Sequence, residues 1–491
     1  MTKTLEWLNG IIWGVPALVL ILGVGLYLTS GTGAAQITLF PKACSIFCKR
    51  LRKKEAGQGS VSPFRALCTA LAATIGTGNL AGVAGAIAIG GPGVVFWMWC
   101  SAILGMVTKF AEATLAVRFR VKDSHGGYVS GPMYIIREGM GTRWAWLGSV
   151  YCFFGVVAAF GVGNATQINT VVAGINQAAA VFGRHLSTQG NLLLGVALGI
   201  LVMFLLMGGA KRIGSLAERL VPFAALLYLL LGFGVLALRW QRIPGALAAI
   251  VEGAFTPRAV TGGIVGSGFQ TLRIGVSRGV FTNEAGMGTA AIAHGAAAVQ
   301  HPVEQGLMGI IEVFLDTIVI CTMTALVILC SGIPVPYGED TGILLTTEAF
   351  TSVYGGWVSV FIALSVCCFA IATILGWGLY GIRCAQYLFG ERVWKLFAVV
   401  QSGIVVAGAM MKSGTVWMLS ELFNGLMAIP NLIALAVLSP EVVGLTREYK
   451  RKFGRHSASG GTYEHLNQCK SLRTLSHEKI PSSRGCGKKT G

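Results

Sequence analysis

The sequence predicts an all-α polytopic membrane protein with about 11 transmembrane helices. Of its 491 residues, 54% are hydrophobic and only 12% are charged, and its mean hydropathy is +0.69. A water-soluble chain of this length would carry far more charge on its surface. Apolar runs of roughly 20 residues, the length that a helix needs to cross a bilayer, recur along the chain. The strands of a membrane β-barrel would instead alternate apolar and polar residues over about 10 positions.

The apolar runs define the predicted order of elements. They lie at residues 11–30, 63–89, 92–117, 146–180, 190–209, 215–238, 257–283, 303–331, 352–381, 391–411 and 414–438. If the first span is an addition, the other ten divide into five and five, so the second half enters the membrane from the opposite face. This predicts an inverted repeat. The expected organisation is an extra helix and basic loop at 1–62, a first repeat at 63–256, a second repeat at 257–440 and a basic tail at 441–491.

The net charge of +18 gathers on one predicted side of the membrane. Seven Lys/Arg residues lie between Lys42 and Arg65, and eleven follow Ser439. Because basic loops stay in the cytoplasm, the N-terminus is expected outside and the C-terminus inside, in a plasma (cytoplasmic or inner) membrane. The tail is expected either to be disordered or to touch anionic lipid headgroups. Neither a nucleic acid nor an obligate protein partner is expected.

The second predicted span contains a run of poor helix formers, Thr74–Asn79. Backbone polar groups must be satisfied inside lipid, so non-helical backbone at mid-membrane persists where it lines a cavity or binds something. A helix that ends near Ala73 presents carbonyl groups to a cation, and a helix that starts near Asn79 presents N–H groups to an anion. The alternative is that these glycines only permit close helix packing.

A second break is predicted in the span 257–283, at Gly266–Gly268. Paired broken helices that open two inverted halves are the arrangement of secondary transporters whose site lies at the midplane. The segment Ser277–Gly288 is interpreted as an inner-loop element. The charged residues inside spans are expected to pair at an inner gate or to relay protons, and they are Lys109, Glu112, Arg273, Arg278, Glu312 and Asp316.

Four segments carry a resemblance to a known family: "ATIGTGN" at 73–79, "GGPGVVFWMWCSAILG" at 90–105, "GVSRGVFTNEAGMG" at 275–288 and "HPVEQGLMGIIEVFLDT" at 301–317. They resemble the alanine/glycine:cation symporter family, from about Pro63 to Pro440. The resemblance implies the fold of sodium-coupled neurotransmitter transporters, a sodium ion for coupling, and symport of small neutral amino acids into the cell. A proton-coupled amino acid permease remains an alternative. A membrane-embedded enzyme is a further one, but the chain has no HExxH, GxSxG or GxxxxGK[ST] motif.

The same resemblance implies a binding site. The expected sodium ligands are the carbonyl groups of Ala72, Ile75 and Phe369 and the hydroxyl of Thr373. The expected substrate-binding residues are Thr77, Gly78, Asn79, Gln167, Gly266, Ser267, Gly268, Phe269, Thr373 and Trp377. The N–H groups of the first break would receive the substrate carboxylate, and carbonyl groups of the second would accept the ammonium.

Three aromatic and polar side chains are expected to complete this site. Phe269 would close over the substrate side chain, Trp377 would wall the pocket and Gln167 would add a polar contact. Thr373 and Trp377 lie four apart on one helical face, and ordinary helix packing is the alternative for both. Asn164, three residues before Gln167, is expected to make an interhelical hydrogen bond instead.

Overall fold

The computed structural model describes residues 2–52, 61–123, 126–256, 268–339, 342–411 and 413–458. Across these residues the chain is helical apart from its connecting loops and one antiparallel hairpin, β1 (Val121–Lys122) with β2 (Tyr128–Val129). Residues Met1–Leu445 form one compact unit. Residues from Thr446 onward form a second unit, of which the structure describes the end of helix α21.

Nine helical stretches of the described residues are long and apolar enough to cross a membrane, and a tenth is formed by one bent pair of helices. The nine contain α1 (Thr2–Ile12) with α2 (Val15–Thr32), α7 (Val94–Arg118), α9 (Ala145–Phe160) with α10 (Thr166–Val181), α11 (Thr188–Leu206), α12 (Gly209–Leu238), α16 (Pro302–Val313) with α17 (Thr322–Ser331), α19 (Val358–Phe389), α20 (Trp394–Met410) and α21 (Ser413–Ala458). The bent pair is α5 (Pro63–Thr74) with α6 (Ala81–Gly90). The polytopic all-α architecture is therefore confirmed.

The remaining helices are short or lie between spans. They are α3 (Ala35–Thr38), α4 (Phe40–Arg52), α8 (Pro132–Tyr134), α13 (Ile243–Phe255), α14 (Gly268–Asn283), α15 (Thr289–His294) and α18 (Ile343–Tyr354). The predicted span 257–283 lies partly outside the described residues, and its described part is α14. The last helix differs from its prediction, since α21 continues 20 residues beyond Leu438, to Ala458.

The first helix break is where the glycine pattern places it. The Ser62 hydroxyl caps the start of α5 by accepting from Arg65 N, and Pro63 follows it at the first helical position. The helix then ends at Thr74, and the chain bends by 58° before α6. The short 3₁₀ turn η1 (Thr77–Asn79) fills the bend, and its residues are buried. A buried turn that interrupts the α-helix inside an apolar span is therefore present at this position.

A second break lies between α14 and α15, at residues 284–288. The backbone is left-handed there, with φ of 55° at Glu284, 89° at Gly286 and 78° at Gly288. All residues from Phe281 to His294 are buried, so the interpretation of Ser277–Gly288 as an inner-loop element is wrong. The predicted break at Gly266–Gly268 falls mostly on residues outside the described ranges, and Gly268 itself is the first residue of α14.

Helix α7 packs against the helices on both sides of the second break. It packs against α14, α15 and α16. On α14, Gly275 and Gly279 approach α7 so closely that an added Cβ would overlap Val94 or Ser101. Small residues at such contacts allow two helix backbones to approach closely. This packing matters in a membrane because the hydrophobic effect does little to bring helices together there.

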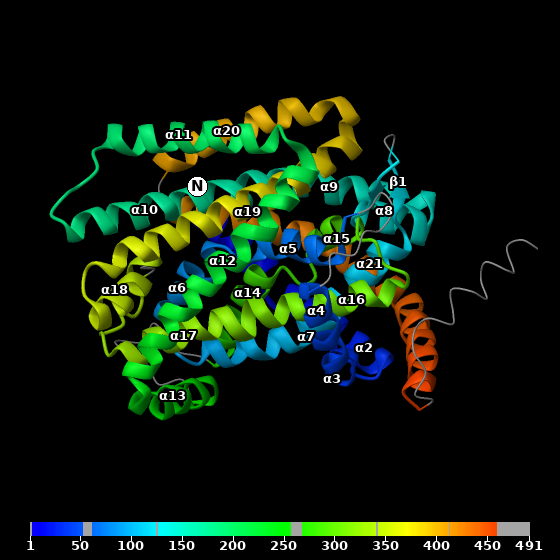
Figure 1. The fold of residues 1–491 in the computed structure, drawn as a ribbon, viewed down its shortest axis with the longest axis horizontal. Helices are drawn as coiled ribbons and strands as arrows, with labels where there is room; N and C mark the ends of the chain where they lie inside the picture. Colours follow the sequence, from blue (N-terminus) through cyan, green and yellow to red (C-terminus); the bar gives the residue numbers. More distant parts are fainter. Residues whose placement is uncertain are drawn as a thin grey trace, which may run out of the picture. The chain divides into compact units, whose positions relative to one another are not determined.

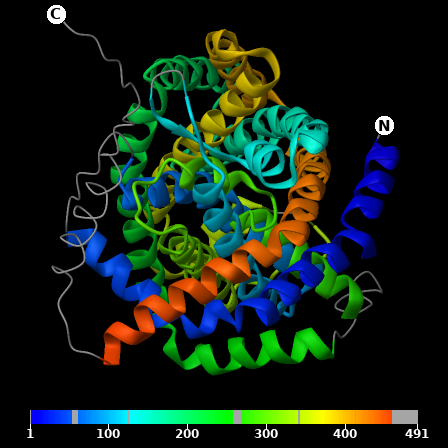
Figure 2. The same ribbon diagram turned by 90° about the vertical axis from the view of Figure 1, so that its right-hand side faces the viewer.

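The outer helices complete the bundle. Figure 1 shows α11 and α20 side by side, in contact along their length. Figure 2 shows α1, in blue, beside the orange first turns of α21. Two hydrogen bonds join these helices: Asn9 Nδ2 donates to the Met418 carbonyl at 2.9 Å and Trp13 Nε1 to the Glu421 carbonyl at 2.8 Å. The additional N-terminal span is thus attached to the last one.

Candidate functional site

The first break is enclosed by side chains from two other helices. A Cβ on Gly76 would lie 2.6 Å from Thr373 Oγ1 of α19 and 3.1 Å from Gln167 Oε1 of α10. Thr77 and Asn79 are fully buried. Glycine at position 76 therefore lets both side chains lie directly against its backbone.

Gln167 is held against the break by hydrogen bonds at both ends of its amide. Its Oε1 accepts from Thr77 N at 3.2 Å and from Thr77 Oγ1 at 3.0 Å. Its Nε2 donates to the Val162 carbonyl at 3.0 Å. That carbonyl lies in the π-helical segment η4 (Gly161–Ala165), where the normal helical pairing is interrupted. The structure thus brings together Gln167 and Thr77, two of the predicted substrate-binding residues.

Three of the four residues predicted to bind sodium, Ala72, Ile75 and Thr373, lie at this break. The Gly76 N–H donates to Asn79 Oδ1 at 2.9 Å, so the Ala72 carbonyl loses its helical donor. Thr373 Oγ1 donates to the Ile75 carbonyl at 3.4 Å. Phe369 lies one turn earlier on α19 and is buried. Carbonyl and hydroxyl oxygens are hard ligands suited to an alkali cation. In the described part of the chain, no group of three His, Cys, Asp or Glu side chains could hold a metal ion.

A chain of hydrogen bonds joins the two breaks through η6 (Phe314–Cys321), a π-helical segment between α16 and α17. Asn79 Nδ2 donates to Asp316 Oδ1 at 2.7 Å, and Thr317 Oγ1 donates to Asp316 Oδ2 at 2.8 Å. Asn283 Nδ2, at the end of α14, donates to Thr317 Oγ1 at 3.1 Å. The expectation that Asp316 pairs with another charged residue is therefore wrong among the described residues, because amide and hydroxyl groups surround it.

The second break also carries carbonyl groups without their helical donors. Ala285 N donates to Asn283 Oδ1 at 2.9 Å, and not to the Phe281 carbonyl four residues earlier. Gly286 N donates to Glu112 Oε1 at 3.0 Å, and not to the Thr282 carbonyl. Gly78 of the first break lies against this end of α14, since its added Cβ would be 3.4 Å from Thr282 Cγ2 and 3.7 Å from Phe281 Cδ1. The two breaks thus meet at Gly78.

The remaining predicted residues lie at different distances from this point. Trp377 is buried, and its Nε1 donates to Glu284 Oε1 at 2.7 Å, so its indole faces the second break. Asn164 Nδ2 donates to the Gln401 carbonyl at 2.6 Å, which confirms the expected interhelical bond. Phe269 is 53% exposed in the first turn of α14, about 21 Å from Asn283 at 1.5 Å per residue. The structure does not bring Phe269 to the breaks.

Sequence reasoning missed Phe281, Thr282 and Glu284. Their signal is the string "FTNEAGMG", in which two glycines and an asparagine follow an apolar helix. Gly266 and Ser267, which were expected to accept the substrate ammonium, lie outside the described residues.

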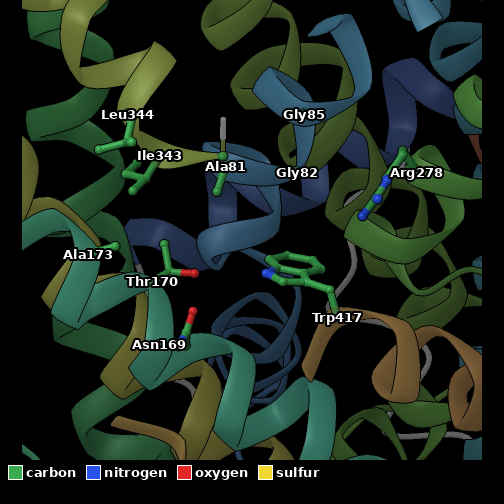
Figure 3. A pocket seen from close by; sticks show the side chains of 11 residues that line it. Ala81, Gly82, Gly85, Asn169, Thr170, Ala173, Arg278, Ile343, Leu344 and Trp417 are labelled. Atoms are coloured by element: carbon green, nitrogen blue, oxygen red, sulfur yellow. The ribbon is translucent and has the colours of Figure 1, made fainter. Parts of the chain in front are cut away.

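A cavity of about 190 Å³ lies beside the first break, on the α6 side. Figure 3 shows Ala81, Gly82 and Gly85 of α6 facing Asn169 and Thr170 of α10, with Arg278 and Trp417 across the opening. Arg278 Nη1 lies 2.9 Å from Glu421 Oε1, so the expectation that Arg278 pairs within the predicted set of charged residues is wrong. Arg278 also lies over the Trp417 ring, 5.6 Å from its centroid. The Phe281 ring packs on Trp417 at 5.4 Å between centroids. These contacts join α14 to α21 at the cavity.

Two buried helix breaks that meet inside a bundle of apolar spans define a class, the multi-spanning secondary transporters. The fold agrees: the solved structure of MhsT in complex with L-phenylalanine matches with a TM-score of 0.53 at 12% identity, over 80% of this chain and 99% of that one. The chain belongs to the sodium:alanine symporter family, whose model matches residues 1–460. It is therefore a cation-coupled amino acid transporter of the membrane.

Three relatives show how far the similarity extends. The sodium/alanine symporter AgcS of Methanococcus maripaludis is 40% identical over 447 residues, which cover 90% of this chain and 95% of AgcS. An uncharacterized transporter of Haemophilus influenzae is 41% identical over 448 residues, covering 91% and 95%. The probable sodium/glutamine symporter GlnT of Bacillus subtilis is 38% identical over 448 residues, covering 90% of each.

Proposed function

We propose that this protein is a sodium-coupled symporter that carries small neutral amino acids of the alanine and glycine type into the cell by alternating access. One observation carries the proposal: two breaks, each with carbonyl groups that have lost their helical donors, meet at Gly78. The names of AgcS and GlnT, a sodium/alanine symporter and a probable sodium/glutamine symporter, support the coupling ion and the substrate class.

Sodium binds at the C-terminal end of α5 in this proposal. Its ligands are the carbonyl groups of Ala72, Ile75 and Phe369 and the Thr373 hydroxyl. The negative end of the α5 dipole favours a cation there. Thr373 Oγ1 is already within 3.4 Å of the Ile75 carbonyl oxygen, so a cation between them would require a small movement. When sodium binds, the Thr373 hydroxyl turns its lone pairs toward the ion and fixes the break against α19.

The substrate carboxylate binds to the N–H groups of Thr77, Gly78 and Asn79, at the positive end of α6. Gln167 Oε1 already accepts from Thr77 N, which shows that this N–H can reach an oxygen acceptor. In the loaded state the substrate carboxylate accepts the hydrogen bond from Thr77 N in place of Gln167 Oε1. The Gln167 amide then donates to the same carboxylate. Trp377 then walls the pocket from the side of Glu284, to which its Nε1 donates.

The substrate ammonium is assigned to the carbonyl groups of Phe281 and Thr282. They replace the predicted Gly266–Gly268 set, because they lie at the break that meets Gly78. The Phe281 ring takes the role predicted for Phe269 and closes over the substrate side chain. A Cβ added at Gly78 would already be in van der Waals contact with Thr282 and Phe281, and this close approach supports a small substrate side chain.

Transport follows from the opening of each side in turn. The cavity beside α6 is the outer access route, and the Arg278–Glu421 pair closes it by joining α14 to α21. After sodium and substrate bind, the two breaks move together because Asn79, Asp316, Thr317 and Asn283 connect them. The inner side then opens toward the basic loops, with the N-terminus outside in a cytoplasmic membrane.

The test is uptake of labelled alanine into proteoliposomes with an inward sodium gradient, compared with an equal potassium gradient. Uptake should require sodium. The Thr373→Ala variant should need more sodium, whereas Ser365→Ala should behave as wild type. Ser365 is a matched control two turns earlier on α19, and its hydroxyl donates to the Phe361 carbonyl of its own helix. Equal uptake in potassium would refute sodium coupling.

A further inference from the structure

Four buried carboxyl groups and a single buried lysine surround the second break in the described part of the chain. They are Glu112, Glu284, Glu312, Asp316 and Lys109. Glu312 is satisfied by two partners, since its Oε1 lies 3.0 Å from Lys109 Nζ and its Oε2 lies 2.8 Å from His294 Nε2. The other three carboxyl groups make no ion pair with a described residue. An ionised carboxylate inside a membrane bundle is costly unless a cation or a proton compensates it.

Glu112 differs from the other two unpaired acids. Both oxygens of Asp316 accept hydrogen bonds, from Asn79 and Thr317, and both oxygens of Glu284 accept, from Trp377 and Thr289. Glu112 instead accepts three hydrogen bonds, all of them at Oε1. Its Oε2 has no hydrogen-bond partner among the described residues. A proton on Oε2 therefore displaces no existing hydrogen bond.

The three bonds to Glu112 Oε1 tie separate elements together. Gly286 N and Gly288 N of the second break both donate to it at 3.0 Å, and Asn431 Nδ2 of α21 donates at 2.8 Å. Asn431 Nδ2 also donates to the Gly286 carbonyl at 2.9 Å. Bonds to a charged acceptor are roughly twice as strong as bonds to a neutral one. The charge on Glu112 thus sets how firmly α7 and α21 hold the second break.

Titratable groups from every neighbouring element act on Glu112. Lys109 lies one turn earlier on the same helix, and Glu312 of α16 already pairs with it. Glu284, at the break itself, accepts hydrogen bonds from Trp377 and Thr289. Two buried tyrosines of neighbouring helices have hydroxyls without a hydrogen-bond partner among the described residues, Tyr151 of α9 and Tyr380 of α19.

We propose that Glu112 Oε2 is a proton-binding site that controls the second break. The proposal rests on the transport function proposed above. At high pH the ionised carboxylate holds Gly286 and Gly288 and keeps the inner half closed. At low pH a proton from solution forms an O–H bond at Oε2, the negative charge is lost, and the three bonds to Oε1 weaken. The inner half then opens more readily, so exchange of substrate becomes faster as the pH falls.

The test measures sodium-equilibrated alanine exchange in proteoliposomes, with equal pH on both sides, from about pH 5 to 8. Wild-type exchange should rise about ten-fold toward the acid end, which corresponds to about 1.4 kcal/mol. Glu112→Gln, which keeps an amide oxygen acceptor and cannot titrate, should lose this dependence and exchange quickly at every pH. Glu112→Asp should keep a dependence. Glu138→Gln removes an exposed carboxylate that pairs with Arg137, and should follow wild type.

A second measurement does not depend on transport. Infrared difference spectra of the purified protein between the two pH extremes should show the carbonyl stretch of a protonated carboxyl group in wild type, and this band should be absent from Glu112→Gln. An unchanged band in that variant, or an unchanged pH profile of exchange, would overturn the proposal. If wild type shows no sodium-driven uptake but the Glu112 band is present, the proposed transport function fails and the proton site stands.

Discussion

Gly76→Ala offers the sharpest test of the proposed sodium site. The added Cβ would lie 2.6 Å from Thr373 Oγ1 and 3.1 Å from Gln167 Oε1, and both atoms belong to buried side chains. The backbone at Gly76 is extended, with φ of −137° and ψ of −157°, so alanine can adopt it and the effect is purely steric. Thr373 is β-branched and cannot turn freely within a helix. We therefore expect the cost of overpacking, about 1–3 kcal/mol.

The distances from the added Cβ to its neighbours predict that this cost affects sodium binding. The nearest atom to the new methyl is the hydroxyl that is assigned to sodium, so the methyl displaces a ligand. The sodium concentration for half-maximal alanine uptake should rise by about ten-fold or more, since each 1.4 kcal/mol is a factor of ten. Gly403→Ala, in α20, is the control because its Cβ would meet no atom within 4 Å. The sodium dependence of that variant should not change.

A double mutant separates this clash from a general loss of stability. If Thr373 Oγ1 is the obstacle, Thr373→Ala should relieve the overpacking caused by Gly76→Ala. The thermal stability of the double mutant should then exceed the sum of the single effects by about 0.5–3 kcal/mol, the range for residues in contact. Wild-type sodium dependence in Gly76→Ala, or strict additivity in this cycle, would refute the placement of Thr373 against the break.

Three further outcomes are expected. Thr373→Ala should raise the half-saturating sodium concentration about ten-fold, a loss of 1–2 kcal/mol for one hydroxyl ligand, whereas Thr373→Ser should change it far less; titration of uptake with sodium measures both. Phe281→Ala should admit valine or leucine with a preference shift of roughly ten- to a hundred-fold, and Phe269→Ala should not; competition with labelled alanine tests this, and equal effects would remove Phe281 from the pocket. Peptide mass spectrometry should find Cys44 and Cys48 unlabelled by an impermeant thiol reagent in intact cells and labelled after permeabilisation; Cys48 is exposed in the structure, so labelling in intact cells would invert the predicted topology.

The first break could be predicted because its physical signal is local. A run of poor helix formers in the middle of an apolar span conflicts with the surrounding pattern, and Gly76 then lies where the bend occurs. Gln167 and Thr77 are 90 positions apart, and the family resemblance placed both in one predicted binding site without predicting their contact. No periodicity in the sequence could have done so.

The position of the second break could not be predicted from the sequence. The chain has 68 glycines, so the Gly-Met-Gly string at 286–288 does not stand out, and the break was predicted at the Gly-Ser-Gly string 266–268 instead. Asn283 and Glu284 made the region of the Gly-Met-Gly string resemble a loop. Both are tolerated inside the bundle because distant partners satisfy them: Thr317 binds Asn283, and Trp377 and Thr289 bind Glu284. Local sequence does not contain those partners.

Asp316 shows a different limit. Four residues separate it from Glu312, a spacing that places both on one face of an α-helix. The π-helical turn at Phe314–Cys321 widens the helix and changes that register. Glu312 therefore meets Lys109 and His294, while Asp316 meets Asn79. Such a turn has no reliable signature in a single sequence.

The Lys109–Glu312 pair also bears on biogenesis. Its two members are 203 positions apart, from 109 to 312, and chains are synthesised at about 5–20 residues per second. Lys109 therefore waits about 10–40 s for its partner after it leaves the ribosome, in a segment destined for the bilayer. A charged side chain at the centre of an inserting helix costs about 2.5–3.5 kcal/mol. The apolar residues of α7 must outweigh that cost alone until α16 is synthesised, so α7 depends on the insertion machinery during this interval.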